Sequence, residues 1–151
     1  MESLPVSPQV QVRGKLLYSL GFAVIQLAIL TASVGFVLRP DTATLLLAAA
    51  LALLVSWPVS AICLMNDLVS PKLSWTNPQQ AMKGNFNTLI AGVVSLLYLG
   101  AFYFGVRALY PAVLTGWALY VVVGGALVLT GGLLHKGMEA LASSRYKSIE
   151  L

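Results

Sequence analysis

Four long apolar runs without a single charged side chain dominate this sequence. They extend over residues 16–38, 43–65, 88–106 and 112–134. A helix of roughly 20 residues crosses the hydrocarbon core of a bilayer, and backbone groups in lipid must be satisfied within the spanning segment itself. The runs therefore predict an all-α integral membrane protein with four transmembrane helices.

The composition agrees with this class of protein. Only 9% of the 151 residues are charged and 58% are hydrophobic, whereas a soluble domain carries about 25% charged residues. The net charge of +4 does not indicate nucleic-acid binding, because the basic residues lie at the ends of the apolar runs and not on one stripe. The lone cysteine, Cys63, lies within the second run and is interpreted as a buried, inert thiol.

The runs divide the chain into a leader (1–15), a four-helix transmembrane domain (16–135) with a polar loop at 66–87, and a tail (136–151). The connections "RPDT" at 39–42 and "RALYP" at 107–111 are short, so we expect two antiparallel hairpins. The tail fits an amphipathic helix on the membrane surface. A frayed terminus is the alternative interpretation.

Lysine and arginine are distributed unequally between the two sides of the membrane. The leader, loop and tail share one side, whereas the other side holds only Arg39 and Arg107. The richer side holds Arg13, Lys15, Lys72, Lys83, Lys136, Arg145 and Lys147. The positive-inside rule therefore places both termini and the loop in the cytoplasm. We expect the membrane to be the plasma membrane.

The sequence offers little for chemistry of its own. No Asp or Glu lies within a run, although proton-coupled carriers generally need an ionisable group there. His135 ends the fourth run, where we expect it to cap the helix or to meet lipid headgroups. No phosphate-binding loop, metal-ligand cluster or nucleophile–base pair occurs. We therefore expect neither an enzyme nor a bound cofactor or metal, and any energy must come from a partner.

Several residues inside the runs carry a packing or polar signal. Gln26 lies near the midplane of the first run, where its amide either forms an interhelical hydrogen bond or lines a substrate path. Gly116, Gly124 and Gly131 are spaced to share one face of the fourth helix, which packs either within this chain or against another subunit. Pro58 is expected to kink the second helix.

The polar loop contains the string "NDLVSPKLSWTNPQQAMKGN" at 66–85. Asn77 followed by Pro78 is typical of a helix start, and Gln80 can complete a capping box. We expect a short cytoplasmic helix that presents Leu73, Trp75 and Met82. This helix forms a docking surface, or it rests on lipid.

The same loop carries a wider pattern. Its aspartate at 67, PKL at 71–73, tryptophan at 75, proline at 78, alanine at 81, lysine at 83 and asparagine at 85 resemble the D…PKL.W..P..A.K.N signature in permease subunits of bacterial ABC exporters of the type-2, exporter-like class. The leader "LPVSP" at 4–8, followed by "GK" at 14–15, is similar to the stretch before a membrane helix in that family. Such permeases are several times longer, and this chain resembles their C-terminal four-helix part over its whole length.

The resemblance implies a transmembrane permease subunit, or the C-terminal part of one, that couples a partner ABC ATPase to substrate movement. The remaining permease half or a second copy is a further implied partner. The implied ATPase-contact residues are Pro5, Lys15, Lys72, Leu73, Trp75, Pro78 and Lys83. The alternative interpretation is a small four-helix accessory or scaffold protein that binds another membrane protein through its glycine face and transports nothing.

Overall fold

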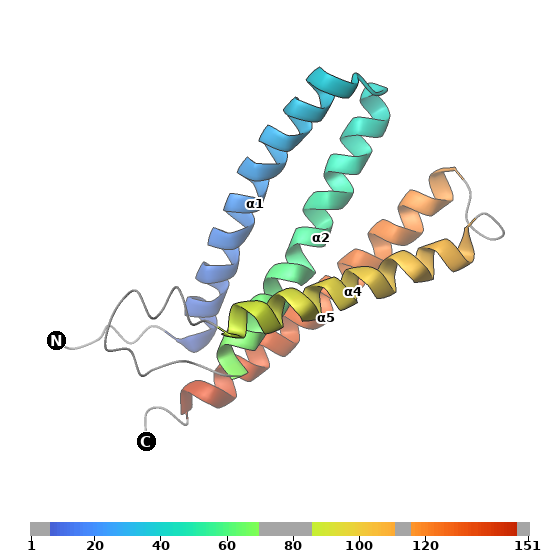
Figure 1. Ribbon diagram of the computed structural model, residues 1–151. Helices are drawn as coiled ribbons and strands as arrows, with labels where there is room; N and C mark the ends of the chain where they lie inside the picture. Colours follow the sequence, from blue (N-terminus) through green and yellow to red (C-terminus); the bar gives the residue numbers. More distant parts are fainter. Residues whose placement is uncertain (1–6, 70–85, 111–115, 148–151) are drawn as a thin grey trace.

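The computed structural model describes residues 7–69, 86–110 and 116–147. This part of the chain consists of four α-helices, which Figure 1 shows: α1 (Pro8–Leu38), α2 (Thr42–Val69), α4 (Phe86–Leu109) and α5 (Trp117–Lys147). Each helix is long and apolar enough to cross a membrane. The prediction of an all-α protein with four long apolar helices is confirmed. Most of the polar loop, where the short helix is predicted, lies outside the described residues.

Helices α1 and α2 contact each other and are joined by a short turn (Figure 1). Arg39 ends α1 in the left-handed conformation, with φ of 46° and ψ of 48°. Asp41 then caps α2, since its Oδ2 accepts a hydrogen bond from the Thr44 N–H at 3.1 Å, which satisfies one of the free amides of the first turn. The turn therefore begins α2 directly after α1 ends.

Helix α2 is the centre of the fold, because it contacts α1, α4 and α5. It approaches α5 closely, since a Cβ on Gly131 would lie 3.1 Å from Trp57 Cε3 and 3.5 Å from Pro58 Cδ. A Cβ on Gly124 would lie 3.8 Å from Leu54 Cδ1. Close contact of this kind is what holds helices together in lipid. Gly124 and Gly131 thus pack within this chain.

Gly116 does not belong to that face. It precedes α5 and has φ of +52°, a conformation that glycine adopts without a steric penalty. The expectation that Gly116 shares a helix face with Gly124 and Gly131 is therefore wrong, because the helix begins only at Trp117.

The four helices meet at one end, and toward the other end α1 and α2 separate from α4 and α5 (Figure 1). We call the first turns of α1 and α4, with the last turns of α2 and α5, the packed end; the opposite helix ends form the splayed end. Among the described residues, none between 17 and 57 and none between 96 and 126 is buried. The protein core therefore lies toward the packed end.

Helix α1 starts inside the predicted leader. Pro8 occupies the first helical turn, a position that needs no N–H donor, and the Ser7 carbonyl accepts the Val10 N–H at 3.0 Å. The charged residues Arg13 and Lys15 end the apolar run without ending the helix.

Helix α5 likewise continues through the predicted tail as far as Lys147. Met138 and Ala142 are fully buried and form one hydrophobic cluster with Val12 and Leu16 of α1. The prediction of a separate surface helix or a frayed end is corrected for residues 136–147, because they continue α5 and because Met138 and Ala142 pack against α1.

Helix α4 packs mainly against α2. The Asn66 Nδ2 donates a hydrogen bond to the Asn87 carbonyl at 2.8 Å. Contact between α4 and α5 is limited: the hydroxyls of Tyr98 and Thr130 are 2.8 Å apart, and a groove of about 340 Å³ separates the two helices toward the splayed end.

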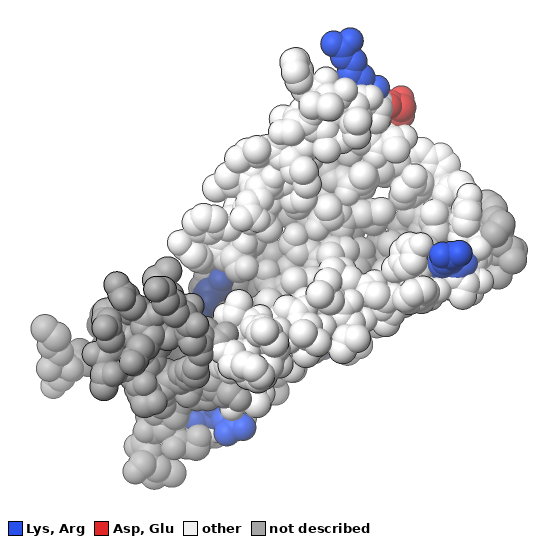
Figure 2. Space-filling model, viewed as in Figure 1, with Lys and Arg blue, Asp and Glu red and all other residues white. Residues whose placement is uncertain are grey.

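The charge-free surface along the helices appears in Figure 2 as a broad white region with charged atoms near the helix ends.

The contact at Gly131 leads to a stability prediction. Gly131→Val forces a branched side chain against Trp57 and Pro58, and overpacking of this kind costs about 1–3 kcal/mol. We expect a lower midpoint of thermal unfolding in detergent, measured by circular dichroism. Gly132→Val is the matched control, because no atom lies within 4 Å of a Cβ at that position. Equal losses in both variants contradict the prediction.

Candidate functional site

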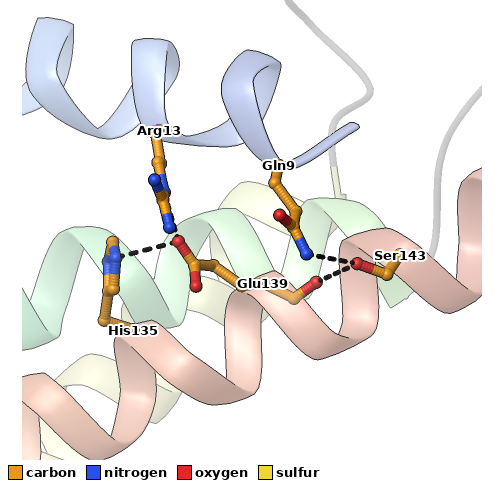
Figure 3. Close-up of polar contacts among 5 residues, drawn as sticks. All are labelled: Gln9, Arg13, His135, Glu139 and Ser143. Atoms are coloured by element: carbon orange, nitrogen blue, oxygen red, sulfur yellow. Dashed lines mark hydrogen bonds and ion pairs between the residues drawn. The ribbon is translucent and has the colours of Figure 1, made fainter. Parts of the chain in front are cut away.

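Five polar side chains join α1 to α5 at the packed end, and we call them the polar cluster (Figure 3). They are Gln9, Arg13, His135, Glu139 and Ser143. The Arg13 guanidinium forms an ion pair with Oε1 of Glu139, and His135 Nε2 lies 3.2 Å from the same oxygen. One turn further along, Gln9 Nε2 donates to Ser143 Oγ at 3.1 Å, and Ser143 Oγ donates to the Glu139 carbonyl at 2.9 Å.

Helical periodicity builds this cluster. Gln9 and Arg13 are four residues apart on α1, and His135, Glu139 and Ser143 follow the same spacing on α5, so each set lies on one face of its helix. The cluster lies beside the buried Val12 and Met138 contact. Polar contacts and apolar packing therefore fasten α1 to α5 over the same two turns.

The charges of the cluster are unequally covered. The Arg13 side chain is 56% exposed, whereas that of Glu139 is only 18% exposed. A largely covered carboxylate needs a partner to offset its desolvation, and the guanidinium and imidazole supply hydrogen-bond donors. The cluster thus leaves little uncompensated charge between the two helices.

His135 occupies a different environment from the one expected. It lies within α5 and does not cap its end, because the helix continues to Lys147. Its ring meets the Trp57 indole edge to face with a centroid distance of 6.1 Å. Its Nδ1 is buried and has no hydrogen-bond partner among the described residues. Through this ring, the cluster touches α2 as well as α1 and α5.

The cluster is suited to holding helices together and not to metal chemistry. Across the described ranges, no group of three or more His, Cys, Asp or Glu side chains is placed to hold a metal ion. One carboxylate and one imidazole beside an arginine form an ion-pair network whose strength depends on the distance between α1 and α5.

Only one of the predicted ATPase-contact residues falls within the described ranges. Lys15 is exposed on α1 close to the packed end. The others lie outside the described residues: Pro5, Lys72, Leu73, Trp75, Pro78 and Lys83.

The intramembrane candidates separate into two groups. Pro58 is buried inside α2 and, like Gly124 and Gly131, takes part in the α2–α5 contact. Gln26 is exposed, and its amide has no hydrogen-bond partner within the described chain. An amide left unpaired in hydrocarbon costs roughly 2–7 kcal/mol, so Gln26 is the polar group of α1 that most needs a partner.

Sequence reasoning missed the link between Arg13 and Glu139. A signal was present, since Arg13 precedes the first apolar run by three residues and Glu139 follows the fourth by five, and both run ends were placed on the same side of the membrane. Opposite charges at similar depth are candidates for pairing. Which faces of α1 and α5 meet was not readable, because both helices are apolar on nearly every side within the membrane.

No protein-family model matches this chain, and neither a curated protein nor a solved structure matches it.

The ion pair predicts how α1 is held. Glu139→Gln keeps the shape of the side chain but removes its charge, and we expect the first turns of α1 to leave α5 more often. Val12 is only 2% exposed. A Val12→Cys probe in a Cys63→Ala background is therefore covered as long as α1 stays packed against α5. Its labelling by a water-soluble maleimide should accelerate about twofold to fivefold, because a solvent-exposed ion pair contributes only modestly to holding the two helices together.

Lys136→Gln serves as the control for this experiment, because it removes an exposed charge from a position of α5 near Glu139. The same acceleration in Lys136→Gln contradicts a specific role for the ion pair.

Proposed function

We propose that this chain is a transmembrane permease subunit, or the C-terminal part of one, of an ATP-driven bacterial ABC exporter. In this proposal the protein lies in the plasma membrane with both termini in the cytoplasm, and it converts contact with a partner ATPase into movement of its helices. The observation that carries the proposal is the arrangement in Figure 1, where the helices are joined at the packed end and diverge toward the splayed end.

This arrangement suits mechanical coupling. Helices that are fastened at one end transmit a small rotation there into a larger displacement at the far end. Lys15 is the proposed ATPase contact that the structure describes, and it lies within three residues of Arg13 of the polar cluster and of the buried Val12 and Leu16. A partner that binds the packed end differently in two states shifts the helices between two arrangements.

The surfaces that would move are apolar. A groove of about 580 Å³ between α1 and α2 is lined by side chains such as Leu27, Thr31 and Leu53, and the groove between α4 and α5 is similar in character. Such linings favour an apolar or amphipathic substrate. The pairing of the helices as two antiparallel hairpins and a short cytoplasmic helix in the polar loop are parts of the same proposal.

An accessory or scaffold protein remains the second candidate. Its proposed glycine face is occupied, because Gly124 and Gly131 pack against α2. The unpaired amide of Gln26 favours this candidate instead, since a membrane protein that binds α1 would satisfy it.

The proposed ATPase contact is tested by co-purification. An ATPase should co-purify with the intact chain from mild detergent, and the double variant Trp75→Ala, Lys83→Ala should lose it, because an aromatic anchor and a charge are removed from the proposed docking surface. Trp117→Ala with Arg107→Ala likewise removes a tryptophan and a basic side chain, but from the splayed end, and should retain the ATPase. Retention by both double variants defeats the docking proposal.

The proposed orientation is tested by labelling. Ser74→Cys in a Cys63→Ala background places a single thiol in the polar loop. An impermeant thiol reagent should leave it unmodified in intact cells and should modify it after permeabilisation. Ready modification from outside overturns the cytoplasmic placement of the loop and, with it, contact with an ATPase there.

A further inference from the structure

Gln26 indicates an interaction surface on α1 that no described residue covers. Its exposed amide lies one position from the centre of the charge-free run 16–38. Other polar side chains in the spans satisfy themselves: Ser33 Oγ donates to the Ile29 carbonyl at 2.8 Å, and Ser56 Oγ donates to the Ala52 carbonyl at 2.9 Å. Hydrocarbon offers no hydrogen bonds to an amide. Its partner must therefore come from outside the described part of the chain.

Gln26 lies in a regularly spaced row along α1, which we call the α1 row: Phe22, Gln26, Ile29, Ser33 and Phe36. The spacing alternates between four and three residues, as in the contact seam of two helices that coil around each other. Phe22, Ile29 and Phe36 are 49%, 64% and 81% exposed. The row is therefore a continuous open seam with one amide within it.

The α1 row faces away from the neighbouring helix of the same chain. The groove toward α2 is lined on α1 by Leu27, Ala28 and Thr31, among others. Leu27 and Thr31 are each two positions from Ile29, and Ala28 is two positions from Gln26. Two positions correspond to about 200° around an α-helix. The row is consequently free to receive another helix without displacing α2.

We propose that the α1 row is the contact surface of a symmetric dimer, occupied by α1 of a second copy of this chain. Two copies inserted in the same orientation are related by a twofold axis along the membrane normal, and the commonest closed assemblies have this symmetry. Each residue of α1 then lies at the same depth as its counterpart in the second copy. Gln26 meets Gln26 of the second copy.

The chemistry of the amide favours this occupant. A carboxamide holds both a donor and an acceptor, so two identical amides at equal depth complete each other. A single polar residue in an apolar seam also fixes the register of the two helices. A helix of another protein needs a polar group at the same depth to do the same, whereas a second copy brings one by symmetry. The proposal does not depend on transport and applies equally to a permease and to a scaffold.

Disulfide cross-linking in native membranes tests the dimer directly. In a Cys63→Ala background, Ile29→Cys should form a disulfide-linked species of twice the chain mass on mild oxidation. Ala28→Cys is the matched control, because it lies at the same depth but lines the groove toward α2; it should remain monomeric. Adding Gln26→Leu to Ile29→Cys should lower the yield, whereas Gln26→Asn, which keeps an amide, should preserve more of it.

The size of the effect follows from measured hydrogen bonds between membrane helices. Gln26→Leu should raise the dimer dissociation constant about threefold to thirtyfold, measured by energy transfer between labelled chains as lipid is added. Leucine makes the span more apolar, so the variant still inserts. Equal cross-linking at positions 28 and 29, a cross-linked species of a different mass, or an unchanged dissociation constant in Gln26→Leu each overturns the proposal.

Discussion

The contact between Gly131 of α5 and the Trp57–Pro58 pair of α2 positions the rest of the fold. In lipid, apolar side chains gain nothing by leaving solvent, so helices associate through close packing and hydrogen bonds. The missing side chain at Gly131 lets the indole of Trp57 approach the α5 backbone. The same approach brings His135 against Trp57 and places Met138 beside Val12 of α1. Helix α4 joins the assembly chiefly through α2.

The lengths of the helices explain why polar contacts accumulate at the packed end. Helices α1 and α5 each contain 31 residues, about 46 Å at the usual rise, which exceeds the hydrocarbon thickness of about 30 Å. Their charge-free parts end at Lys15 on α1 and at Lys136 on α5, and Arg13 and Glu139 lie beyond these lysines. The surplus turns of both helices therefore emerge on the same side, where an arginine and a glutamate can pair without a membrane-centre penalty.

The sequence was sufficient for the helices but not for their contacts. The absence of charge over long runs identified all four, because only a helix satisfies its backbone in lipid. The same criterion misplaced the ends of α1 and α5, since a charge such as Arg13 ends immersion in lipid and not the helix. Spacing identified Gly124 and Gly131 as one face, yet it could not exclude Gly116, because spacing does not reveal where a helix begins.

The candidate site was harder to predict for a physical reason. A helix surrounded by lipid is apolar on every side, so the distribution of its apolar residues does not mark the face that meets another helix. Gln26 stood out from the sequence because a polar group at mid-membrane is rare. A partner for its amide did not, because no described residue supplies one. Arg13 and Glu139 became a pair only once the packing of Val12 against Met138 had fixed which faces of α1 and α5 meet.

The divergence of the helices has a different meaning in lipid than in water. In water, exposed side chains such as Phe36 and Leu133 would drive the splayed end to close through the hydrophobic effect. In hydrocarbon this drive is absent, so opening or closing changes the free energy only through the packing and hydrogen bonds that it makes or breaks. The contacts at the packed end are close, whereas none of the described residues at the splayed end is buried. The position of the splayed end is therefore governed by the packing and hydrogen bonds that the helices make there and by the angle at which α2 and α5 cross beside Gly131.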